Sequence, residues 1–326
     1  MPANLTPEYE RAERGYREAS TDEDRLEALR EMLRAIPKHK GTEKMQADIK
    51  RRISQLRKAE GKKGPRKGLD PFQIPKGGAG QVVLVGPPNV GKSMLVATTT
   101  NASVKVADYP FTTPLPVPGM WRYDDVQIEL VDTPPVLADQ MPPGLMATIR
   151  SADVVCVVVD ASTEPLKQAE MVLGLLDGRG MLLRSAPHNE LDAGDRGVGS
   201  GIIAVNKVDA APAENVSTLC ELYEGRLEVL PVSAAAGDGL AELQQRLWEL
   251  LAVVRVYTKK PGKPADRDNP FTLSVGSTIE DLARAIHREL PGKMKHARIW
   301  GEGRFDGQQV HRSEVLRDRD VVEIRG

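Results

Sequence analysis

The stretch that decides the fold reads Gly86-Pro87-Pro88-Asn89-Val90-Gly91-Lys92-Ser93. It fits the pattern G-x-x-x-x-G-K-[ST], and it stands between an apolar segment, 81–85, and a segment that suits a helix. Phosphate binding needs backbone N–H groups pointing inward around a turn, a helix N-terminus aimed at the anion and a compact cation. We therefore expect Lys92 to contact the β- and γ-phosphates of a nucleotide and the Ser93 hydroxyl to bind Mg²⁺. The flanking strand and helix disfavour the alternative, an incidental glycine-rich turn.

Outward from this loop, the chain alternates between strand-like and helix-like segments. Predicted strands cover 81–85, 119–122, 126–131, 154–160, 202–206 and 227–232, and predicted helices follow Gly91, lie near Leu145 and cover 165–176, 213–223 and 240–251. This alternation predicts an α/β fold, in which helices cover both faces of a doubly wound, mostly parallel sheet. The polar, glycine-rich residues 185–201 are expected to form a surface loop.

The chain before this region is charged and predicted to be helical over residues 1–68. Two apolar stripes at helical spacing indicate a helical hairpin or arm: Leu26, Leu29, Leu33 and Ile36, then Met45, Ile49, Ile53 and Leu56. The second half of the arm carries a basic run: Lys50, Arg51, Arg52, Arg57, Lys58, Lys62, Lys63, Arg66 and Lys67. A solvated helix face and an RNA-contacting face both fit this run. Residues 69–80 then predict a glycine-rich linker.

We assign residues 81–254 to one domain, named here the P-loop domain after the phosphate-binding loop 86–93. The pattern of strands and helices changes after it. Residues 255–326 combine short strands with one helix and predict a small α+β domain. Ser277 and Glu280 stand at capping-box spacing and are expected to begin that helix. Its predicted core stripe is Ile279, Leu282, Ile286 and Leu290. We expect this domain to carry a basic face that contacts RNA phosphates non-specifically, formed by Lys259, Lys260, Lys263, Arg267, Lys293 and Lys295.

Composition narrows the classes of function. The 326 residues include 45 Lys and Arg against 46 Asp and Glu, so no global charge attracts nucleic acid or anionic lipid. Cys156 lies in an apolar run and Cys220 has no obvious partner, which favours a reducing cytoplasm over a disulfide framework. The absence of a leader-like start and of 18 consecutive apolar residues predicts neither secretion nor a membrane span. The five histidines show no metal-ligand spacing.

A second motif, Asn206-Lys207-Val208-Asp209, ends an apolar strand, where doubly wound sheets present ligand-binding loops. The Asp209 carboxylate can accept both N1–H and the exocyclic amine of guanine, an arrangement that adenine cannot match. Asn206 would tie this loop to the P-loop, and Lys207 would lie along the base. The stretch Ser233-Ala234-Ala235 would supply a backbone N–H to the guanine oxygen. These residues predict a GTP or GDP site and disfavour an ATPase.

Two further predictions complete the site. Asp132, at the end of the strand 126–131, is expected to hold Mg²⁺ through water, although a strand-end turn aspartate is the alternative. Thr112 and Thr113 offer hydroxyls to the metal, and we favour Thr113, which with Lys92 forms the predicted catalytic pair. The predicted nucleotide-binding residues are Gly86, Pro87, Asn89, Val90, Gly91, Lys92, Ser93, Asn206, Lys207, Asp209, Ser233, Ala234 and Ala235.

These motifs carry a family resemblance. GPPNVGKS, ADYPFTTP, VDTP, NKVD and VSA, in this order, resemble the Obg-like branch of GTPases. The tail, with RVYTKKPGKP, ARIWGEG and DVVEI, is similar to the TGS domain, a ubiquitin-like β-grasp module. Together with the helical N-terminus, the chain resembles the developmentally regulated GTP-binding proteins over nearly its whole length. The resemblance implies GTP hydrolysis, a switch mechanism and association with ribosomes or RNA.

The chain departs from the usual pattern in its switch region. Related GTPases usually read D-x-x-G where this chain has Asp132-Thr133-Pro134-Pro135. Proline has no N–H, so Pro135 cannot donate to a γ-phosphate, and the following Val136 cannot orient water as a glutamine would. We therefore expect slow intrinsic hydrolysis. The connection 177–201 is too short for the inserted domain of eukaryotic relatives.

The sequence is compatible with two alternatives at Asn89 and with two alternatives for the function of the protein. Asn89 either shapes its loop or holds K⁺ against the phosphates. The protein either switches between GTP and GDP states that a partner reads, or is a nucleotide-stabilised module that grips RNA or the ribosome through its basic arm and TGS domain. Pro135 and Val136 keep the second alternative open.

Overall fold

The chain divides into two compact units, residues 1–70 and 71–326, in a computed structural model. The structure describes residues 7–18, 22–36, 42, 45–53, 72, 74–100, 115–137, 141–142, 144–191 and 197–325. None of the helices in these ranges is long and apolar enough to cross a membrane. The domain boundaries at 68, 80 and 254 stay predictions.

The first unit is a small helical assembly. Helix α1 spans Pro7–Glu18, α2 spans Asp22–Ala35, and residues 45–53 are also helical. Its core contains the predicted Leu29, Leu33, Ile36, Met45, Ile49 and Ile53, joined by Tyr9, Ala12, Tyr16, Met32 and Ala35. The side chain of Leu26, residue Leu56 and the basic residues from Arg57 to Lys67 lie outside the described part. Lys50, Arg51 and Arg52 are exposed.

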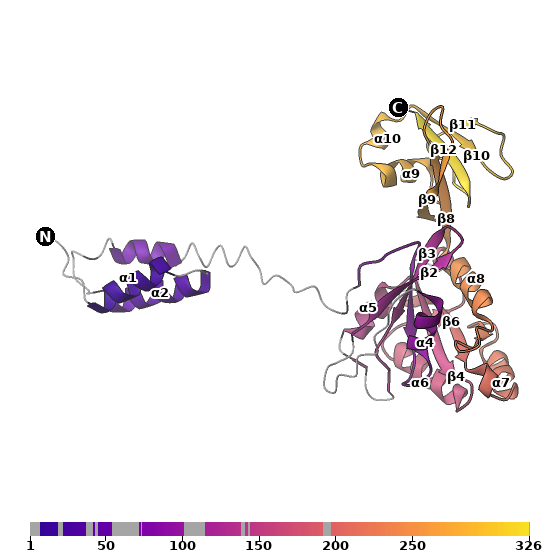
Figure 1. Cartoon of the computed structure of the whole chain (residues 1–326), viewed down its shortest axis with the longest axis horizontal. Helices are drawn as coiled ribbons and strands as arrows, with labels where there is room; N and C mark the ends of the chain where they lie inside the picture. The colour runs from indigo at the N-terminus through magenta and orange to yellow at the C-terminus, as the bar shows by residue number, and fades with distance from the viewer. Residues whose placement is uncertain are drawn as a thin grey trace. The chain divides into compact units, whose positions relative to one another are not determined.

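The second unit contains a seven-stranded sheet in the order β2-β3-β1-β4-β6-β5, with β7 also paired to β6 (Figure 1). Its strands are β1 (Gln81–Val85), β2 (Val117–Tyr123), β3 (Val126–Asp132), β4 (Val154–Asp160), β5 (Leu182–Arg184), β6 (Val198–Asn206) and β7 (Val229–Pro231). Neighbouring strands run parallel except β2 and β3, which form an antiparallel hairpin. The predicted α/β fold with a mostly parallel sheet is thus present.

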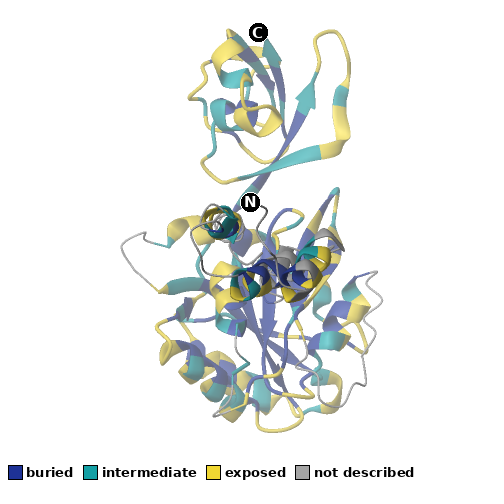
Figure 2. Ribbon diagram, turned by 90° about the vertical axis from the view of Figure 1, so that its left-hand side faces the viewer, coloured by how far each residue is buried: buried dark blue, intermediate teal, exposed yellow. Residues whose placement is uncertain are grey.

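Two hydrophobic cores lie on the two faces of this sheet. Helices α4 (Lys92–Thr99) and α8 (Leu240–Leu251) pack on one face, and α5 (Leu145–Ser151), α6 (Pro165–Asp177) and α7 (Glu214–Tyr223) pack on the other. Along β4, Val155, Val157 and Val159 join the second core, whereas Val154, Cys156 and Val158 join the first, as the period of two requires. Figure 2 shows these strands buried between helices whose outer faces are exposed.

The parallel strands bring distant polar residues to one edge of the sheet. Strand β1 ends at Val85 directly before the P-loop, and β3, β4 and β6 end at Asp132, Asp160 and Asn206. Because the carboxyl ends of parallel strands meet at one edge, the predicted motifs converge there.

The C-terminal domain is a five-stranded sheet covered by a helix. Its strand order is β11-β10-β12-β8-β9, with bounds β8 (Val253–Lys259), β9 (Ala265–Ser274), β10 (His296–Trp300), β11 (Gln308–Val310) and β12 (Asp320–Arg325). Helix α9 (Ile279–Ile286) and the short α10 (Leu290–Lys293) follow β9. The core joins Ile279, Leu282 and Ala283 of α9 to Val254, Val256, Ala297, Ile299 and Val322 of the strands.

Three predictions about these elements were wrong. The N-cap of α9 is Thr278, with Asp281 as its capping-box partner, and not Ser277 with Glu280. The backbone of Ser277 already bonds to Ser274 and Leu316, so the helix begins one residue later. Ile286 ends the helix with an exposed side chain instead of joining the core. Residues 198–201, predicted as loop, belong to β6 because β5 pairs with residues 198–200 and β4 pairs with Gly201.

The corrected cap can be tested by a single substitution. Thr278 Oγ1 accepts from the Asp281 N–H, and the Asp281 carboxylate accepts from the Thr278 N–H at 2.9 Å. Thr278→Ala should speed amide exchange of α9 about fivefold, since an N-cap contributes about 1 kcal/mol. Hydrogen-exchange mass spectrometry of α9 peptides measures this. Ser277→Ala is the matched control, and an equal effect there would show that the cap is misassigned.

Candidate functional site

The P-loop has a backbone that requires glycine at its two ends. A Cβ at Gly86 would lie 2.2 Å from the Val158 carbonyl oxygen. Gly91 has a φ of 92°, and a Cβ there would lie 2.3 Å from Asn206 Nδ2. Such distances are far inside van der Waals contact, so neither position accepts a side chain. The backbone of residues 86–91, which we call the cradle, is therefore free of side chains at both of its ends. It lies directly before the N-terminus of α4, as phosphate binding requires.

Lys92 is buried at the floor of this cradle. Its ammonium group donates to the carbonyl oxygens of Gly86 and Pro87, both at 2.8 Å. Burial lowers the pKa of Lys92 to about 8, although the Asp132 carboxylate acts in the opposite direction. A phosphate group beside the ammonium would favour its charged form, because an anion at this distance offsets the loss of solvation.

Ser93 and Asp132 form a pair that suits a divalent cation. The Ser93 hydroxyl donates to Asp132 Oδ2 at 2.5 Å, while Asp132 Oδ1 is buried and has no hydrogen-bond partner among the described residues. Burial raises the pKa of Asp132, against the opposing effects of Ser93 and Lys92. A hydroxyl and a carboxylate with an unused oxygen are ligands that Mg²⁺ takes directly or through water. Thr112 and Thr113 lie outside the described residues.

Asn206 joins the P-loop to the loop after β7. Its Nδ2 donates to the Val90 carbonyl at 2.8 Å, and its Oδ1 accepts from the Ala234 N–H at 3.0 Å. The side chain is buried, so both ends of the amide are satisfied within the protein. The structure thus brings together three sequence motifs that lie far apart in the chain.

Lys207 and Asp209 lie beside this junction. Lys207 has a left-handed backbone (φ 67°), and its ammonium donates to the Asn89 carbonyl at 2.7 Å and to Asp160 Oδ2 at 2.5 Å. Asp209 lies in the short helical turn η2 (Val208–Ala210) and is exposed. The Ser233 hydroxyl donates to Asp209 Oδ1 at 2.6 Å and holds the carboxylate in place.

The structure narrows the prediction for residues 233–235. The N–H of Ser233 donates to the Asp238 carbonyl, and that of Ala234 donates to Asn206. Within the described part of the chain, only Ala235 among these three keeps an N–H without a partner. A donor for a base oxygen is therefore available at Ala235 alone, while Ser233 acts through its hydroxyl.

Sequence reasoning missed Asp160 and Thr98. Burial of Asp160 opposes its ionisation, but hydrogen bonds from Lys207 and Ser162 outweigh this and lower its pKa. Asp160 thereby fixes the Lys207 side chain along the site. Thr98 donates to the Ala234 carbonyl at 3.1 Å and anchors the same loop to α4. The signal for Asp160 was its place at a strand end, next to the other motifs.

The switch residues have a definite arrangement. Val136 is fully buried in the core beneath α5 and α6, and its N–H donates to the Gly86 carbonyl at 3.1 Å. Pro135 is exposed. The Thr133 hydroxyl donates to the Leu84 carbonyl at 2.5 Å. In this arrangement the side chain of residue 136 faces the core and not the phosphate cradle.

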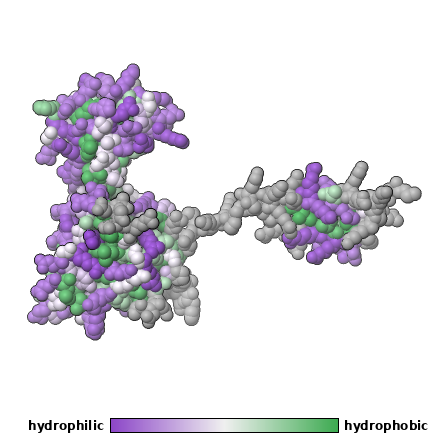
Figure 3. All heavy atoms as spheres, turned by 180° about the vertical axis from the view of Figure 1, so that it is seen from behind, coloured by the Kyte–Doolittle hydropathy of each residue, from purple (hydrophilic) through white to green (hydrophobic). Residues whose placement is uncertain are grey.

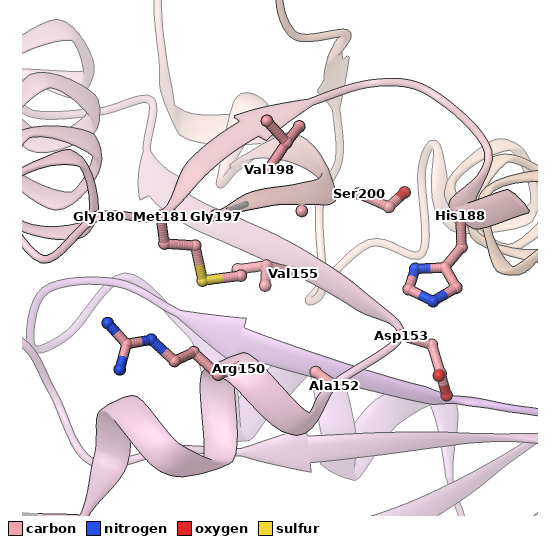
Figure 4. Close-up of a pocket in the computed structure, with 11 residues that line it drawn as sticks. Arg150, Ala152, Asp153, Val155, Gly180, Met181, His188, Gly197, Val198 and Ser200 are labelled. Carbon is pink, nitrogen blue, oxygen red and sulfur yellow. The ribbon is translucent and has the colours of Figure 1, made fainter. Parts of the chain in front are cut away.

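A second cavity lies at the opposite edge of the sheet, where β4, β5 and β6 begin. It encloses about 460 Å³, and Figure 4 shows Arg150 and Met181 on one side of it, with Asp153 and His188 on the other. Asp153 already accepts from Lys76 and from the Gln81 N–H, and Arg150 donates to the Arg179 carbonyl. These two charged side chains are therefore engaged with the protein, and no cluster of metal-ligating side chains occurs among the residues described.

Comparison with known proteins agrees with this geometry. The family described as 50S ribosome-binding GTPase matches residues 81–183, and the TGS domain matches residues 254–325. Developmentally-regulated G-protein 1 of Arabidopsis thaliana is 27% identical over 365 aligned residues, covering 92% of this chain and 90% of the relative. A GTP-binding protein of Methanocaldococcus jannaschii is 26% identical, covering 93% of this chain and 92% of the relative.

One solved structure shows the same fold. A GTP binding protein from Pyrococcus horikoshii superposes with a TM-score of 0.53 at 18% identity, covering 75% of this chain and 99% of that chain. The comparisons confirm the predicted family resemblance and the α/β GTPase fold followed by a β-grasp TGS domain. The plant alignment is longer than this 326-residue chain, so the relative contains residues that this chain lacks.

The close approach at Gly91 provides a test of the cradle. Gly91→Ala should weaken GDP binding at least about a hundredfold, since the added methyl displaces Asn206 and separates the two nucleotide loops. Fluorescent GDP titration measures the change. Gly225→Ala is the matched control, because Gly225 has a similarly positive φ of 74° but open space around its Cβ position. Equal losses in both variants would contradict the role given to the Gly91–Asn206 contact.

Proposed function

We propose that this chain, a GTP-binding protein with a GTPase domain and a C-terminal TGS domain, hydrolyses GTP with Mg²⁺ and acts as a slow switch read by the ribosome or RNA. One observation carries the proposal. Ser93 and Asp132 pair beneath a glycine cradle that also holds Lys92, and Asp132 keeps one buried oxygen without a partner. A hydroxyl, a carboxylate and a cation converging on a bare-backbone loop suit a metal-bound nucleotide polyphosphate.

Each residue then has a defined task. Lys92 would exchange its two carbonyl partners for phosphate oxygens. Ser93 and Asp132 would hold Mg²⁺, and Thr113 would offer a further hydroxyl to it in the GTP state. When bound, Mg²⁺ supplies positive charge that stabilises the charge developing on the phosphate oxygens. The Gly86–Gly91 backbone orients the phosphates through its N–H groups.

Guanine specificity rests on Asp209 and the loop after β7. Asp209 accepts from N1–H and the exocyclic amine, and the Ser233 hydroxyl bonded to Oδ1 keeps the carboxylate aimed. The free N–H of Ala235 donates to the guanine oxygen. The Lys207 stem lies along the base, held by Asp160 and the Asn89 carbonyl.

The proposed rate is slow because position 136 offers no group to the attacking water. Val136 is an apolar side chain packed in the core, and its N–H is already bonded to Gly86. Pro135 has no N–H to sense the γ-phosphate. Acceleration then requires a group from outside this segment, which is a natural task for a partner.

The ribosome or RNA is the proposed partner. The matched GTPase family is described as ribosome-binding, and the TGS domain carries exposed basic side chains, including Lys260, Lys263, Lys295 and Arg312. On the face shown in Figure 3, hydrophilic side chains cover most of this domain. Such side chains suit phosphate contacts. The unpaired state of Cys156 and Cys220 supports the cytoplasm as the compartment.

Hydrolysis with and without ribosomes tests the switch. We expect a single-turnover rate at or below about 10⁻³ s⁻¹ for the protein alone, as for GTPases without a stabilising arginine, and a rise of at least about tenfold with ribosomes. Radiolabelled GTP conversion measures both. Lys92→Ala should abolish nucleotide binding and serves as the control.

Hydrolysis in neither condition, with tight GTP binding, would contradict the switch and support the alternative. In that alternative the nucleotide is structural and the basic surfaces grip RNA or the ribosome. Ribosome co-sedimentation that is equal with GDP and with a non-hydrolysable GTP analogue would support the same alternative.

A K⁺ requirement is a separate prediction within this proposal. Asn89 has a left-handed backbone (φ 64°), which suits a loop-shaping role, and its side chain is exposed beside the cradle, which suits a cation ligand. If Asn89 holds K⁺, hydrolysis in KCl should exceed that in NaCl, and Asn89→Gly should remove the difference while tolerating the same φ. Equal rates in the two salts would sink the idea.

A further inference from the structure

One buried arginine joins the GTPase domain to the TGS domain. Arg255, in β8, leaves only 4% of its side chain exposed, yet its guanidinium meets three carboxylates. Two of these, Asp124 and Asp125, form the turn of the β2–β3 hairpin, and the third, Asp318, precedes β12. A buried guanidinium is costly unless its donors are satisfied, and here carboxylates of both domains satisfy them.

The contacts on the TGS side are the closest. Asp318 accepts from the Arg255 N–H at 2.7 Å, from Nε at 3.0 Å and from Nη2 at 2.6 Å, which is a bidentate pair reinforced by the backbone. The Arg319 N–H also donates to the Arg255 carbonyl at 2.7 Å. The arginine is therefore fixed within the TGS domain.

The contacts on the GTPase side use the remaining nitrogen and the flat face of the guanidinium. Nη1 donates to Asp124 and Asp125, each at 3.1 Å, and the guanidinium carbon lies 5.1 Å from the ring centre of Trp248 in α8. Trp248 itself stacks on Tyr123 of β2 at 5.0 Å. The Tyr257 hydroxyl adds a bond to Asp125 at 2.5 Å. The hairpin turn is thus held by charge and by stacking together.

The same hairpin reaches the nucleotide site at its other end. Val117 pairs with Asp132 where β2 begins and β3 ends, whereas Tyr123 pairs with Val126 next to the turn. Seven residues of strand span about 20 Å, so one continuous element links the Mg²⁺ carboxylate to the arginine. Asp132, to which the proposed function gives a role in holding Mg²⁺, therefore belongs to the same hairpin as the carboxylates that contact Arg255.

We propose that Arg255 couples the nucleotide state to the orientation of the TGS domain through the β2–β3 hairpin. This inference rests on the proposed switch. A shift of the hairpin between GDP and GTP states moves Asp124 and Asp125, and Arg255 carries that shift to the domain in which it is anchored. By linkage, a partner that holds the TGS domain in one orientation changes the relative affinity for GDP and GTP.

Distance measurement between the two domains tests the coupling. Cys220 is exposed in α7 and Cys156 is fully buried, so one spin label goes on Cys220 and a second on Arg288→Cys, an exposed position of the TGS domain. Pulsed electron resonance should give different distance distributions with GDP and with a non-hydrolysable GTP analogue. In Arg255→Met the two nucleotides should give the same distribution, because the ion pairs are lost while the apolar stem is kept.

Two further variants keep the test decisive. Asp124→Asn with Asp125→Asn removes only the hairpin side of the contact, and it should also abolish the nucleotide-dependent difference even if Arg255→Met fails to fold. Arg319→Ala is the matched control, since Arg319 contacts the same Asp124 from a side chain that is 62% exposed, and it should keep the difference.

The outcomes separate this inference from the proposed function. A nucleotide-dependent difference that survives in the Asp124/Asp125 variant, or no difference in the labelled parent with saturating nucleotide, would overturn the coupling. Loss of GTP binding or of hydrolysis would be seen in the titration and turnover assays, independently of the distances. We expect the distance distribution to depend on the nucleotide in the labelled parent and not in Arg255→Met or in the Asp124/Asp125 variant. The GDP affinity of both variants should stay within about threefold of the parent value.

Discussion

The site depends on one side-chain amide. Asn206 donates to the P-loop at Val90 and accepts from the loop after β7 at Ala234, and the absence of a Cβ at Gly91 lets it come close enough to do both. The P-loop and the loop after β7 are far apart in the chain, and the proposed function assigns the phosphates to the first and the base to the second. The amide holds them at one separation, so that a nucleotide meets a formed site and loses less affinity to loop ordering.

Much of the fold follows from the sequence because its strands are buried on both faces. The runs 82–85 and 154–159 are continuously apolar, and the helix 240–251 has a clear period, so the predicted and observed bounds of these three elements coincide. The strands β5 and β11 have three residues each and exist through pairing with β6 and β10, which no local pattern reveals. The cap of α9 was misplaced by one residue because both registers satisfy the same spacing rule.

Site residues could be predicted from the sequence where they belong to a motif whose residue types and spacing indicate a ligand. Lys92, Ser93, Asp132 and Asn206 lie together as expected from strand order alone. Asp160 was missed because its partner Lys207 is 47 residues away, and the carboxylate has no motif of its own. Among residues 233–235, only Ala235 keeps an N–H for a ligand in the part of the chain described, because those of Ser233 and Ala234 bond within the protein. These bonds are tertiary contacts, which the local sequence does not reveal.

Position 136 bears on both the stability of the fold and the slow hydrolysis that we propose. Val136 fills a fully buried place in the core under α5 and α6, and its N–H holds the Gly86 carbonyl that also accepts from Lys92. A glutamine in that place would bury an amide without partners, at a cost of about 1–3 kcal/mol, so the core at this position favours an apolar side chain. In the proposed function, rapid hydrolysis therefore needs a water-orienting group supplied from outside this segment.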